Sequence, residues 1–509
     1  MMKKIQLITF LFFSIFAFSQ TQDLFSLAKG DFIGFNALFD ENDNLYGYVS
    51  IYSYGKSGDK TKKFEYVILD KNLNPVANKE FEGDITAGNY FGYIDFRKKM
   101  ILSPASVDYS LIRTKDYFTP RSVEVDLAAN IPKTKIYYDY QSGVFNEIAQ
   151  PKNWKEERKE DKTEKKEKGY NYRSAVYEIK EGGFLAIEFN DYGTYINNNS
   201  LIKFDANQKE IWRYKYNTSG DKKISEEIRI VEKDEKNIYL ILQKNNKSDK
   251  TFYLVVIDMQ TGKEIHNKLI DKFSPQTMER ITSYYSYGSS IDNDKTFDDK
   301  IVIVGRNYAS NKFNGFARMM IDKKTFDVDA QFLTYSDDFK KFLPKLGYND
   351  TFTDGYELRT KDFFFLEDGS IGIVMEKYKP QGEYNAPKTK DLYYAFTDKN
   401  FKLKDVKVFE KEKTKWDNND YLFSQYLNDG KDVVFFYRDL QKDETTKDKN
   451  WKLFINTLID GNFKQEEVQI SEKDKYSVYP YVGKEGYILL REFNEKDKFN
   501  KIRLERLNY

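Results

Sequence analysis

The stretch FYLVVIDMQTGKEIHNK (Phe252–Lys268) places an apolar run before Asp258 and a second, more polar run after Gly262. Aspartate suits the start of a tight turn because its carboxylate accepts hydrogen bonds from backbone N–H groups two residues further on. The stretch therefore predicts a β-hairpin. Its second strand holds His266, the single histidine among 509 residues.

The same hairpin recurs along the chain at intervals of 53 to 76 residues. The aspartates expected at its turns are Asp70, Asp139, Asp205, Asp258, Asp322, Asp398 and Asp460. Most of these hairpins follow another strand, such as KNIYLILQ or DKIVIVGR, whose consecutive apolar residues predict burial on both faces. Helical periodicity is scarce, and Asp337–Leu346 is the one short helix expected. The predicted fold class is all-β.

Repeats of this length, with about four antiparallel strands each, are typical of a β-propeller. The count favours eight blades, with seven as the alternative because the second unit, roughly Gly88–Ile148, is irregular. Three strands follow the seventh hairpin, and QDLFSLAKG (Gln22–Gly30) is expected to supply a fourth. We therefore predict a propeller ring that is closed by N-terminal and C-terminal strands.

Residues 1–19 have the pattern of a secretory signal peptide, with two lysines before an apolar run and cleavage expected after Ser19. No later stretch approaches 18 apolar residues, so we expect no transmembrane anchor after cleavage. Residues 20–509 are expected to form a single propeller domain, with the charged segment 151–169 as a loop between blades. The protein is therefore expected to be exported, with the periplasm favoured over the cell surface or the extracellular medium.

The composition excludes several kinds of chemistry. The 82 basic and 81 acidic residues nearly cancel, so a basic face for nucleic acid is not expected. Without cysteine there is no thiolate nucleophile, and one histidine cannot build a zinc site of three or four His and Cys ligands. No phosphate-binding loop or dinucleotide fingerprint is present. Carboxylate chemistry stays open, because a glycosidase needs only two acidic side chains at a set separation.

The turn in IDMQTGKEIH (Ile257–His266) resembles the hairpin of quinoprotein-type propeller repeats, in which an Asp and a Thr-Gly pair precede a Trp that stacks between neighbouring blades. Here His266 occupies the Trp position. Two other hairpins match in part, with Glu147 at the Trp position in one and Trp212 one position early in the other. The resemblance implies a propeller and an inter-blade packing role for His266, with a ligand contact as the alternative. It does not imply bound quinone, because the repeated Trp pattern is absent.

The loop TSYYSYGSSIDND (Thr282–Asp294) is the leading candidate for ligand contact. Tyrosine offers amphipathic contact area at low entropic cost, which suits stacking on a sugar ring or gripping a protein. The candidate ligand-binding residues are Tyr284, Tyr285, Tyr287 and Asp292. The alternative is a blade strand whose tyrosines pack inward. Asp292, Asp294 and Asp298 are predicted to form an ordinary polar turn rather than a metal site, and calcium binding by these residues is the alternative.

These features favour a non-enzymatic, exported propeller scaffold that binds a protein or a glycan partner at the bacterial cell envelope. A carboxylate-dependent, carbohydrate-active hydrolase or lyase is the first alternative, and it predicts an acidic pair facing a pocket. A structural subunit of an envelope assembly is the second, and it predicts a large exposed apolar patch. No catalytic residue or cofactor is predicted, calcium stays open, and so does the oligomeric state. The composition and leader resemble those of exported proteins from AT-rich Gram-negative bacteria.

Overall fold

A computed structural model gives the fold of the chain. It describes residues 21–40, 44–58, 61–85, 87–94, 98–104, 123–134, 136–139, 144–147, 172–179, 183–190, 196–205, 209–218, 221, 223–247, 249–282, 285–286, 289–290, 293–309, 312–347, 350–379, 387–413, 420–442, 445, 447–470, 477–494, 496 and 499–508. The expected signal peptide and the charged segment 151–169 lie outside the described residues. Both therefore stay predictions.

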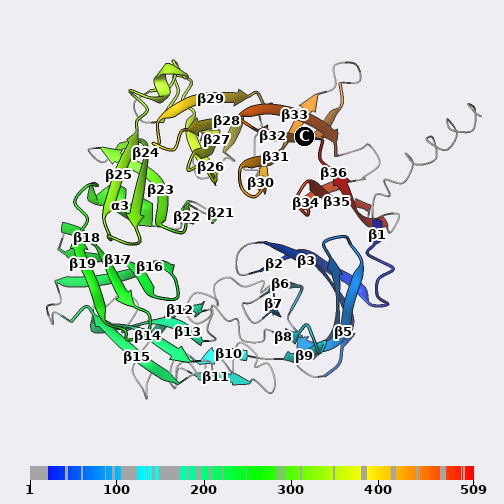
Figure 1. Cartoon of the computed structure of the whole chain (residues 1–509). Coiled ribbons are helices and arrows are strands. Elements are labelled where there is room, and N and C mark those ends of the chain that lie inside the picture. Colours follow the sequence, from blue (N-terminus) through cyan, green and yellow to red (C-terminus); the bar gives the residue numbers. More distant parts are fainter. Residues whose placement is uncertain are drawn as a thin grey trace, which may run out of the picture. The chain divides into compact units, whose positions relative to one another are not determined.

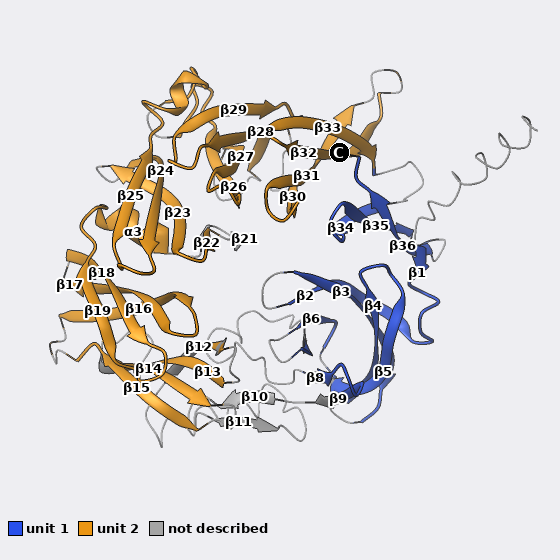
Figure 2. Cartoon of the chain, viewed as in Figure 1, with its two compact units in different colours: residues 1–138, 145–159, 470–509 blue, residues 139–144, 160–469 orange. Residues whose placement is uncertain are grey.

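The described strands form eight four-stranded antiparallel sheets and two short two-stranded hairpins. In seven of the four-stranded sheets, neighbouring strands are consecutive in the sequence, so each sheet is a simple meander. A four-stranded meander is the repeat unit of β-propellers. The all-β class and the propeller-type repeat are thus confirmed. The chain divides into two compact units (Figure 2): residues 1–138, 145–159 and 470–509 form unit 1, and residues 139–144 and 160–469 form unit 2.

Unit 1 contains three four-stranded sheets (Figure 1). The β2–β5 sheet consists of β2 (Asp31–Phe39), β3 (Leu45–Lys56), β4 (Thr61–Asp70) and β5 (Pro75–Asp84). The β6–β9 sheet consists of β6 (Tyr90–Ile94), β7 (Lys99–Pro104), β8 (Val123–Asp126) and β9 (Ile131–Thr134). The terminal sheet has the order β1-β36-β35-β34 and consists of β1 (Thr21–Asp23), β34 (Ser477–Val482), β35 (Tyr487–Asn494) and β36 (Phe499–Arg506). Its fourth strand comes from the N-terminal side, with Gln22 opposite Ile502.

Unit 2 contains five four-stranded sheets. The first two consist of β12 (Tyr172–Ile179), β13 (Gly183–Asn190), β14 (Ile196–Asp205) and β15 (Glu210–Tyr216), and of β16 (Ile224–Lys233), β17 (Asn237–Asn246), β18 (Asp249–Asp258) and β19 (Glu264–Leu269). The third consists of β22 (Asp294–Thr296), β23 (Lys300–Ala309), β24 (Lys312–Asp322) and β25 (Val328–Leu333). The last two consist of β26 (Glu357–Phe365), β27 (Ile371–Lys379), β28 (Lys388–Thr397) and β29 (Leu403–Phe409), and of β30 (Tyr421–Leu427), β31 (Asp432–Lys442), β32 (Lys449–Ile459) and β33 (Asn462–Gln469). Two short two-stranded hairpins stand outside the four-stranded sheets. They are β10 (Ile136–Asp139) with β11 (Val144–Glu147), and β20 (Tyr285–Ser286) with β21 (Ser289–Ser290). Only the second lies wholly within unit 2.

Helical structure is sparse among the described residues. One α-helix, α3 (Pro275–Thr282), lies between β19 and β20 and buries Met278 and Ile281. The helix expected over Asp337–Leu346 is wrong, because only a single 3₁₀ turn, η1 (Phe339–Lys341), forms there. Pro344 explains the difference, since it lacks an N–H donor and disfavours helical geometry in the residue before it. No helix in the described part of the chain is long and apolar enough to cross a membrane.

Successive sheets within each unit pack against one another through buried apolar side chains. This packing explains the consecutive apolar residues that mark the central strands. In β17, Leu240 faces the cluster shared with the β12–β15 sheet, whereas Ile241 faces the cluster shared with the β22–β25 sheet. Both side chains are almost fully buried. A strand covered on both faces has no solvent side, so its sequence does not alternate.

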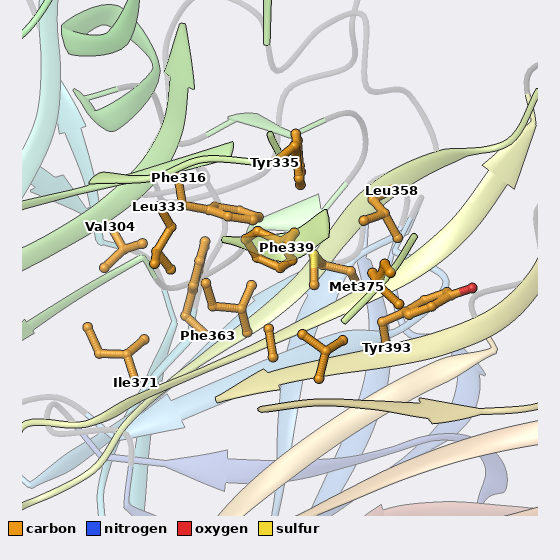
Figure 3. Close-up of a cluster of buried hydrophobic side chains, with 14 of the residues drawn as sticks. Val304, Phe316, Leu333, Tyr335, Phe339, Leu358, Phe363, Ile371, Met375 and Tyr393 are labelled. Carbon is orange, nitrogen blue, oxygen red and sulfur yellow. The ribbon is translucent and has the colours of Figure 1, made fainter. Parts of the chain in front are cut away.

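The largest of these clusters lies between the β22–β25 and β26–β29 sheets (Figure 3). The connection between the two sheets contributes Tyr335 and Phe339, which are completely buried. The Phe339 ring centroid lies 6.0 Å from that of Phe316 on β24, and Phe316 in turn lies 6.1 Å from Phe363 on β26. The connection is therefore part of the core and fixes the spacing of the two sheets.

Six of the seven predicted turn aspartates lie where the third strand of a sheet turns into the fourth. Five of their carboxylates accept hydrogen bonds from backbone N–H groups two to four residues on, at 2.7–3.1 Å. These five are Asp70, Asp205, Asp258, Asp322 and Asp398. The side chain thus closes the turn as the sequence pattern suggests.

Two turns depart from that pattern. In the β6–β9 sheet the turn aspartate is Asp126, which accepts two backbone N–H bonds at 3.0 Å, whereas Asp139 ends β10 in a two-stranded hairpin. At the seventh turn, Asp460 and Gly461 both have positive φ, 48° and 75°. This is the pattern of a two-residue hairpin turn. There the Asp460 backbone N–H donates to the carboxylate of Asp432, at 2.9 Å.

Candidate functional site

The tyrosine-rich loop predicted to contact ligand lies largely outside the described residues. Tyr284, Tyr287 and Asp292 are among those not described. Tyr285 lies in β20, whose backbone pairs with β21. The ligand-binding role of these four residues therefore stays a prediction.

Two of the residues considered for calcium are described. Asp294 lies in β22, and its carboxylate is 3.8 Å from the guanidinium of Arg229. Asp298 is exposed in the turn between β22 and β23. Within the described ranges, no group of three His, Asp or Glu side chains is placed to hold a metal ion. Because Asp292 is not described, the structure tests neither the ordinary polar turn predicted here nor its alternative, a calcium site on Asp292, Asp294 and Asp298.

His266 lies in β19, opposite Val256 on β18. Its ring packs against Phe326, which belongs to the β24–β25 turn of the next sheet, with 5.2 Å between ring centroids. The packing role between sheets that was predicted for His266 is confirmed by this contact. The histidine is therefore explained by the repeat rather than by a catalytic site.

A pocket of about 320 Å³ lies between the β26–β29 sheet and the β30–β33 sheet, both in unit 2. Each sheet contributes its outermost strand, β29 or β33, and the central strands β31 and β32 complete the wall. The lining residues are Lys407, Val408, Phe409, Glu410, Tyr437, Gln441, Phe454, Phe463, Lys464 and Gln465. This volume is at the lower end of the range usual for small-molecule sites.

Four aromatic rings form the apolar part of the pocket. Tyr437 and Phe454 are stacked, with centroids 4.8 Å apart and an angle of 9° between the rings. Phe409 meets Phe463 edge to face at 5.8 Å. The Lys407 ammonium lies 4.6 Å from the centroid of Phe463, so a cation–π contact holds it over the ring.

The polar part of the pocket consists of amides, charges and one phenol. Gln465 Nε2 donates to the hydroxyl of Tyr437 at 3.1 Å. Burial raises the pKa of Tyr437, so this hydroxyl stays protonated. Glu410 and Lys407 put a carboxylate and an ammonium on the same wall. The pocket thus combines aromatic faces with donors and acceptors of both signs.

A buried ionic cluster lies between the same two sheets. Lys411 follows β29 with its side chain fully buried, and its ammonium contacts the carboxylates of Asp420 and Glu376, the latter at 3.5 Å. Lys361 on β26 reaches the other oxygen of Glu376 at 2.9 Å. Burial is the main cause that raises the pKa of Glu376, and both lysines oppose it. Buried charges persist only when they are paired in this way.

The cluster is connected to the pocket through Asp439 on β31. Its two carboxylate oxygens accept the backbone N–H of Glu412 at 3.1 and 3.2 Å. One of them also accepts from Nε2 of the pocket residue Gln441, at 3.1 Å. Because Glu410 lines the pocket and Lys411 is anchored behind it, the segment after β29 is fixed from the back. Charge pairing therefore holds this segment of the pocket wall, in addition to the apolar packing of the aromatic rings.

A second group of titratable residues lies in the connection between β25 and β26. Asp350 is partly buried with φ of 62°, and its carbonyl accepts the N–H of Leu358 at 3.1 Å. Its neighbour Thr351 pairs with Glu357 in an isolated β-bridge. Burial first, and then the charge of Glu357, raise the pKa of Asp350 to about 7, with Arg306 acting in the opposite direction. A carboxyl group whose pKa is raised by burial and by a neighbouring acidic residue is a feature of acid–base sites.

Comparison with known proteins gives no family. No protein-family model matches the chain. No curated protein matches it. Solved structures that match include the β-propeller domain of the Trilobed protease from Pyrococcus furiosus, at 10% identity over 84% of this chain and 93% of that chain, with a TM-score of 0.31. A polysaccharide lyase of the PL25 ulvan lyase family matches at 10% identity over 94% of each chain, TM-score 0.31, and the WD40 domain of SCAP from fission yeast at 9% over 76% and 89%, TM-score 0.23. Because these identities and TM-scores are low, the fold is assigned from the sheet topology and not from these matches.

Proposed function

We propose that the protein is an exported β-propeller of eight blades, closed by its N-terminal strand, that binds a protein or glycan partner at the bacterial cell envelope without catalysing a reaction. The eight four-stranded sheets and the pairing of β1 with β36 support the architecture. The sequence of residues 1–19 supports export, with the periplasm favoured. Mass spectrometry of the mature N-terminus and fractionation of the producing cell test the export step.

The observation that carries the binding proposal is the pocket between the β26–β29 and β30–β33 sheets. It has an aromatic floor, a mixed polar rim and a wall fixed from behind by the Lys411 cluster. Pre-organised side chains lose little conformational freedom on binding, which favours affinity. A binding role explains the geometry of this pocket without assigning a catalytic residue to it.

A thermal-shift titration tests this proposal. The mature chain, residues 20–509, is mixed with solubilised envelope extract and with purified envelope polysaccharides, and a ligand of the native state raises Tm in a saturable way. Phe463→Ala removes a pocket ring and should abolish the shift. Phe91→Ala removes an aromatic ring that is 53% exposed and lies outside the pocket, so it should leave the shift intact. A shift that survives Phe463→Ala would place binding elsewhere and overturn the proposed site.

The alternative, a carboxylate-dependent hydrolase or lyase, is favoured by one observation, the Asp350–Glu357 pair. In that reading Asp350 would be the acid and Glu357 the base. Incubation with polysaccharides, followed by assay of new reducing ends, tests it. Turnover that Asp350→Asn abolishes and Asp337→Asn, at an exposed carboxylate, preserves would replace the binding proposal with an enzyme.

A further inference from the structure

The apolar floor of the pocket between β29 and β33 has a shape that suits a flat ligand with one hydrophobic face. Phe409, Tyr437, Phe454 and Phe463 supply it, and three of these rings are less than a tenth exposed. Only Phe463 is partly exposed, with Lys407 over its ring. A volume of about 320 Å³ accommodates a small cyclic group rather than an extended chain.

The rim carries hydrogen-bonding capacity that the described part of the protein leaves unused. Glu410 forms no ion pair with any described residue, so its carboxylate can accept from a ligand. The Tyr437 oxygen accepts from Gln465, while its own proton has no acceptor among the described residues. The Gln441 amide nitrogen donates to Asp439, which leaves its oxygen as an acceptor. Acceptors and a donor thus surround the aromatic floor.

The matching ligand should have one apolar face surrounded by groups that both donate and accept hydrogen bonds. A pyranose ring has this chemistry, because its C–H face packs on aromatic rings while each hydroxyl donates and accepts one hydrogen bond. A polyanion fits less well, since Glu410 would oppose it, and a polycation would meet Lys407. An added peptide strand would use backbone edges rather than these side chains.

We infer that this pocket binds one sugar ring of a glycan, stacked on Phe463, with the ring hydroxyls held by Glu410, Tyr437 and Gln441. The inference rests on the proposed binding function and names the ligand class for the same site. Glu410 and Gln441 accept hydrogen bonds from hydroxyls, and Tyr437 donates one. Lys407 lies over the Phe463 ring, so its side chain has to move aside for the sugar to stack on that ring.

Isothermal titration of the mature chain with defined oligosaccharides tests the inference. The probes are tri- to hexasaccharides of glucose, galactose, xylose and N-acetylglucosamine, and at least one should bind. Glu410→Gln replaces a charged acceptor with a weaker neutral one, and Tyr437→Phe removes the hydroxyl donor. Each should raise Kd about tenfold, because a hydrogen bond to a charged or buried group contributes roughly 1.4 kcal/mol. Glu467→Gln, on β33 but outside the pocket, should leave Kd unchanged.

The outcomes separate the ligand class from the function. Binding of an oligosaccharide that weakens with the pocket variants, in proteins of unchanged Tm, supports the sugar site. Absence of binding to every oligosaccharide, with an envelope protein retained in a manner that Glu410→Gln or Phe463→Ala abolishes, overturns the sugar class and leaves the binding function. Oligosaccharide binding that no pocket variant alters overturns the site. Failure to bind any oligosaccharide or any envelope protein would overturn both proposals.

Discussion

The turns between β18 and β19 and between β24 and β25 have the same backbone but opposite side-chain arrangements. In each, the N–H of the fifth turn residue donates to the aspartate carbonyl at 2.9 Å, from Gly262 to Asp258 and from Phe326 to Asp322. The fifth residue has positive φ in both, 68° at Gly262 and 60° at Phe326. Identical hydrogen bonding therefore holds a glycine in one turn and a large aromatic residue in the other.

The difference follows from what the preceding sheet brings to each turn. Trp212 on β15 fills the space beside Gly262, where a Cβ atom would lie 2.5 Å from the indole. Its Nε1 donates to the carbonyl of Met259 at 3.1 Å. At the other turn the preceding strand presents the smaller His266, and Phe326 extends from the turn to meet it. In both places a large aromatic side chain fills the space between neighbouring sheets. It comes from the strand at Trp212 and from the turn at Phe326.

The largest loss of stability is expected for Trp212→Ala. The indole is 9% exposed and belongs to the cluster between the β12–β15 and β16–β19 sheets. No side chain of the glycine turn can fill the cavity, so the free energy of unfolding should fall by about 3–5 kcal/mol. Urea unfolding followed by tryptophan-independent circular dichroism measures it. A loss below about 1 kcal/mol would mean that the indole is not the support of this turn.

Gly262→Ala should be the next most damaging change. It adds a Cβ at positive φ and against the indole, which should lower the free energy of unfolding by about 2–3 kcal/mol. In the Trp212→Ala background the clash is absent, so the same change should cost only about 1 kcal/mol for the backbone conformation. A double-mutant cycle in urea gives both values. If Gly262→Ala lowers the free energy of unfolding equally in both backgrounds, the loss does not come from contact with the indole.

Phe326→Gly should have a smaller effect because two contributions oppose each other. The ring contacts with His266 and with Tyr239, 5.2 and 6.2 Å between centroids, are lost, while the strain of a non-glycine residue at positive φ is removed. The net loss should be about 1 kcal/mol. Adding His266→Trp to Phe326→Gly imitates the first turn and should recover stability, which thermal unfolding would show. A further loss in the double variant would argue against exchange of bulk between strand and turn.

Much of this fold could be predicted from local chemistry. An aspartate that bonds its own turn is a short-range event, so the hairpins at Asp70, Asp205, Asp258, Asp322 and Asp398 were visible in the sequence. Asp126 was not predicted as a turn aspartate, because the repeat is irregular there and nearby Asp139 also fits a hairpin pattern. The strand count from the sequence nevertheless favoured eight four-stranded units, and the described residues form eight four-stranded sheets.

The candidate site was not predictable in the same way. Its pocket joins Lys407 to Gln465 across two sheets, and no local pattern brings such distant residues together. Lys411 lies in the run EKEKTK, which reads as a solvated turn. It is instead fully buried, because Asp420 just before β30 and Glu376 on β27 pair with it. Only tertiary placement reveals that this lysine is structural.

The smallest effect, and the sharpest test of the shared turn geometry, is the response to acid. The hydrogen bond from the Thr261 hydroxyl, followed by backbone hydrogen bonds, lowers the pKa of Asp258, and backbone hydrogen bonds lower that of Asp322. A carboxyl group whose pKa is lower in the folded state stabilises the protein above its unfolded pKa of 3.8 and loses that contribution as the pH falls through the folded value. Asp258→Asn and Asp322→Asn should each flatten the decline of Tm below about pH 4, Asp258→Asn more so because Thr261 Oγ1 donates to its carboxylate at 2.7 Å. Unchanged acid sensitivity in both variants would show that the aspartates direct the turns without their charge contributing to stability.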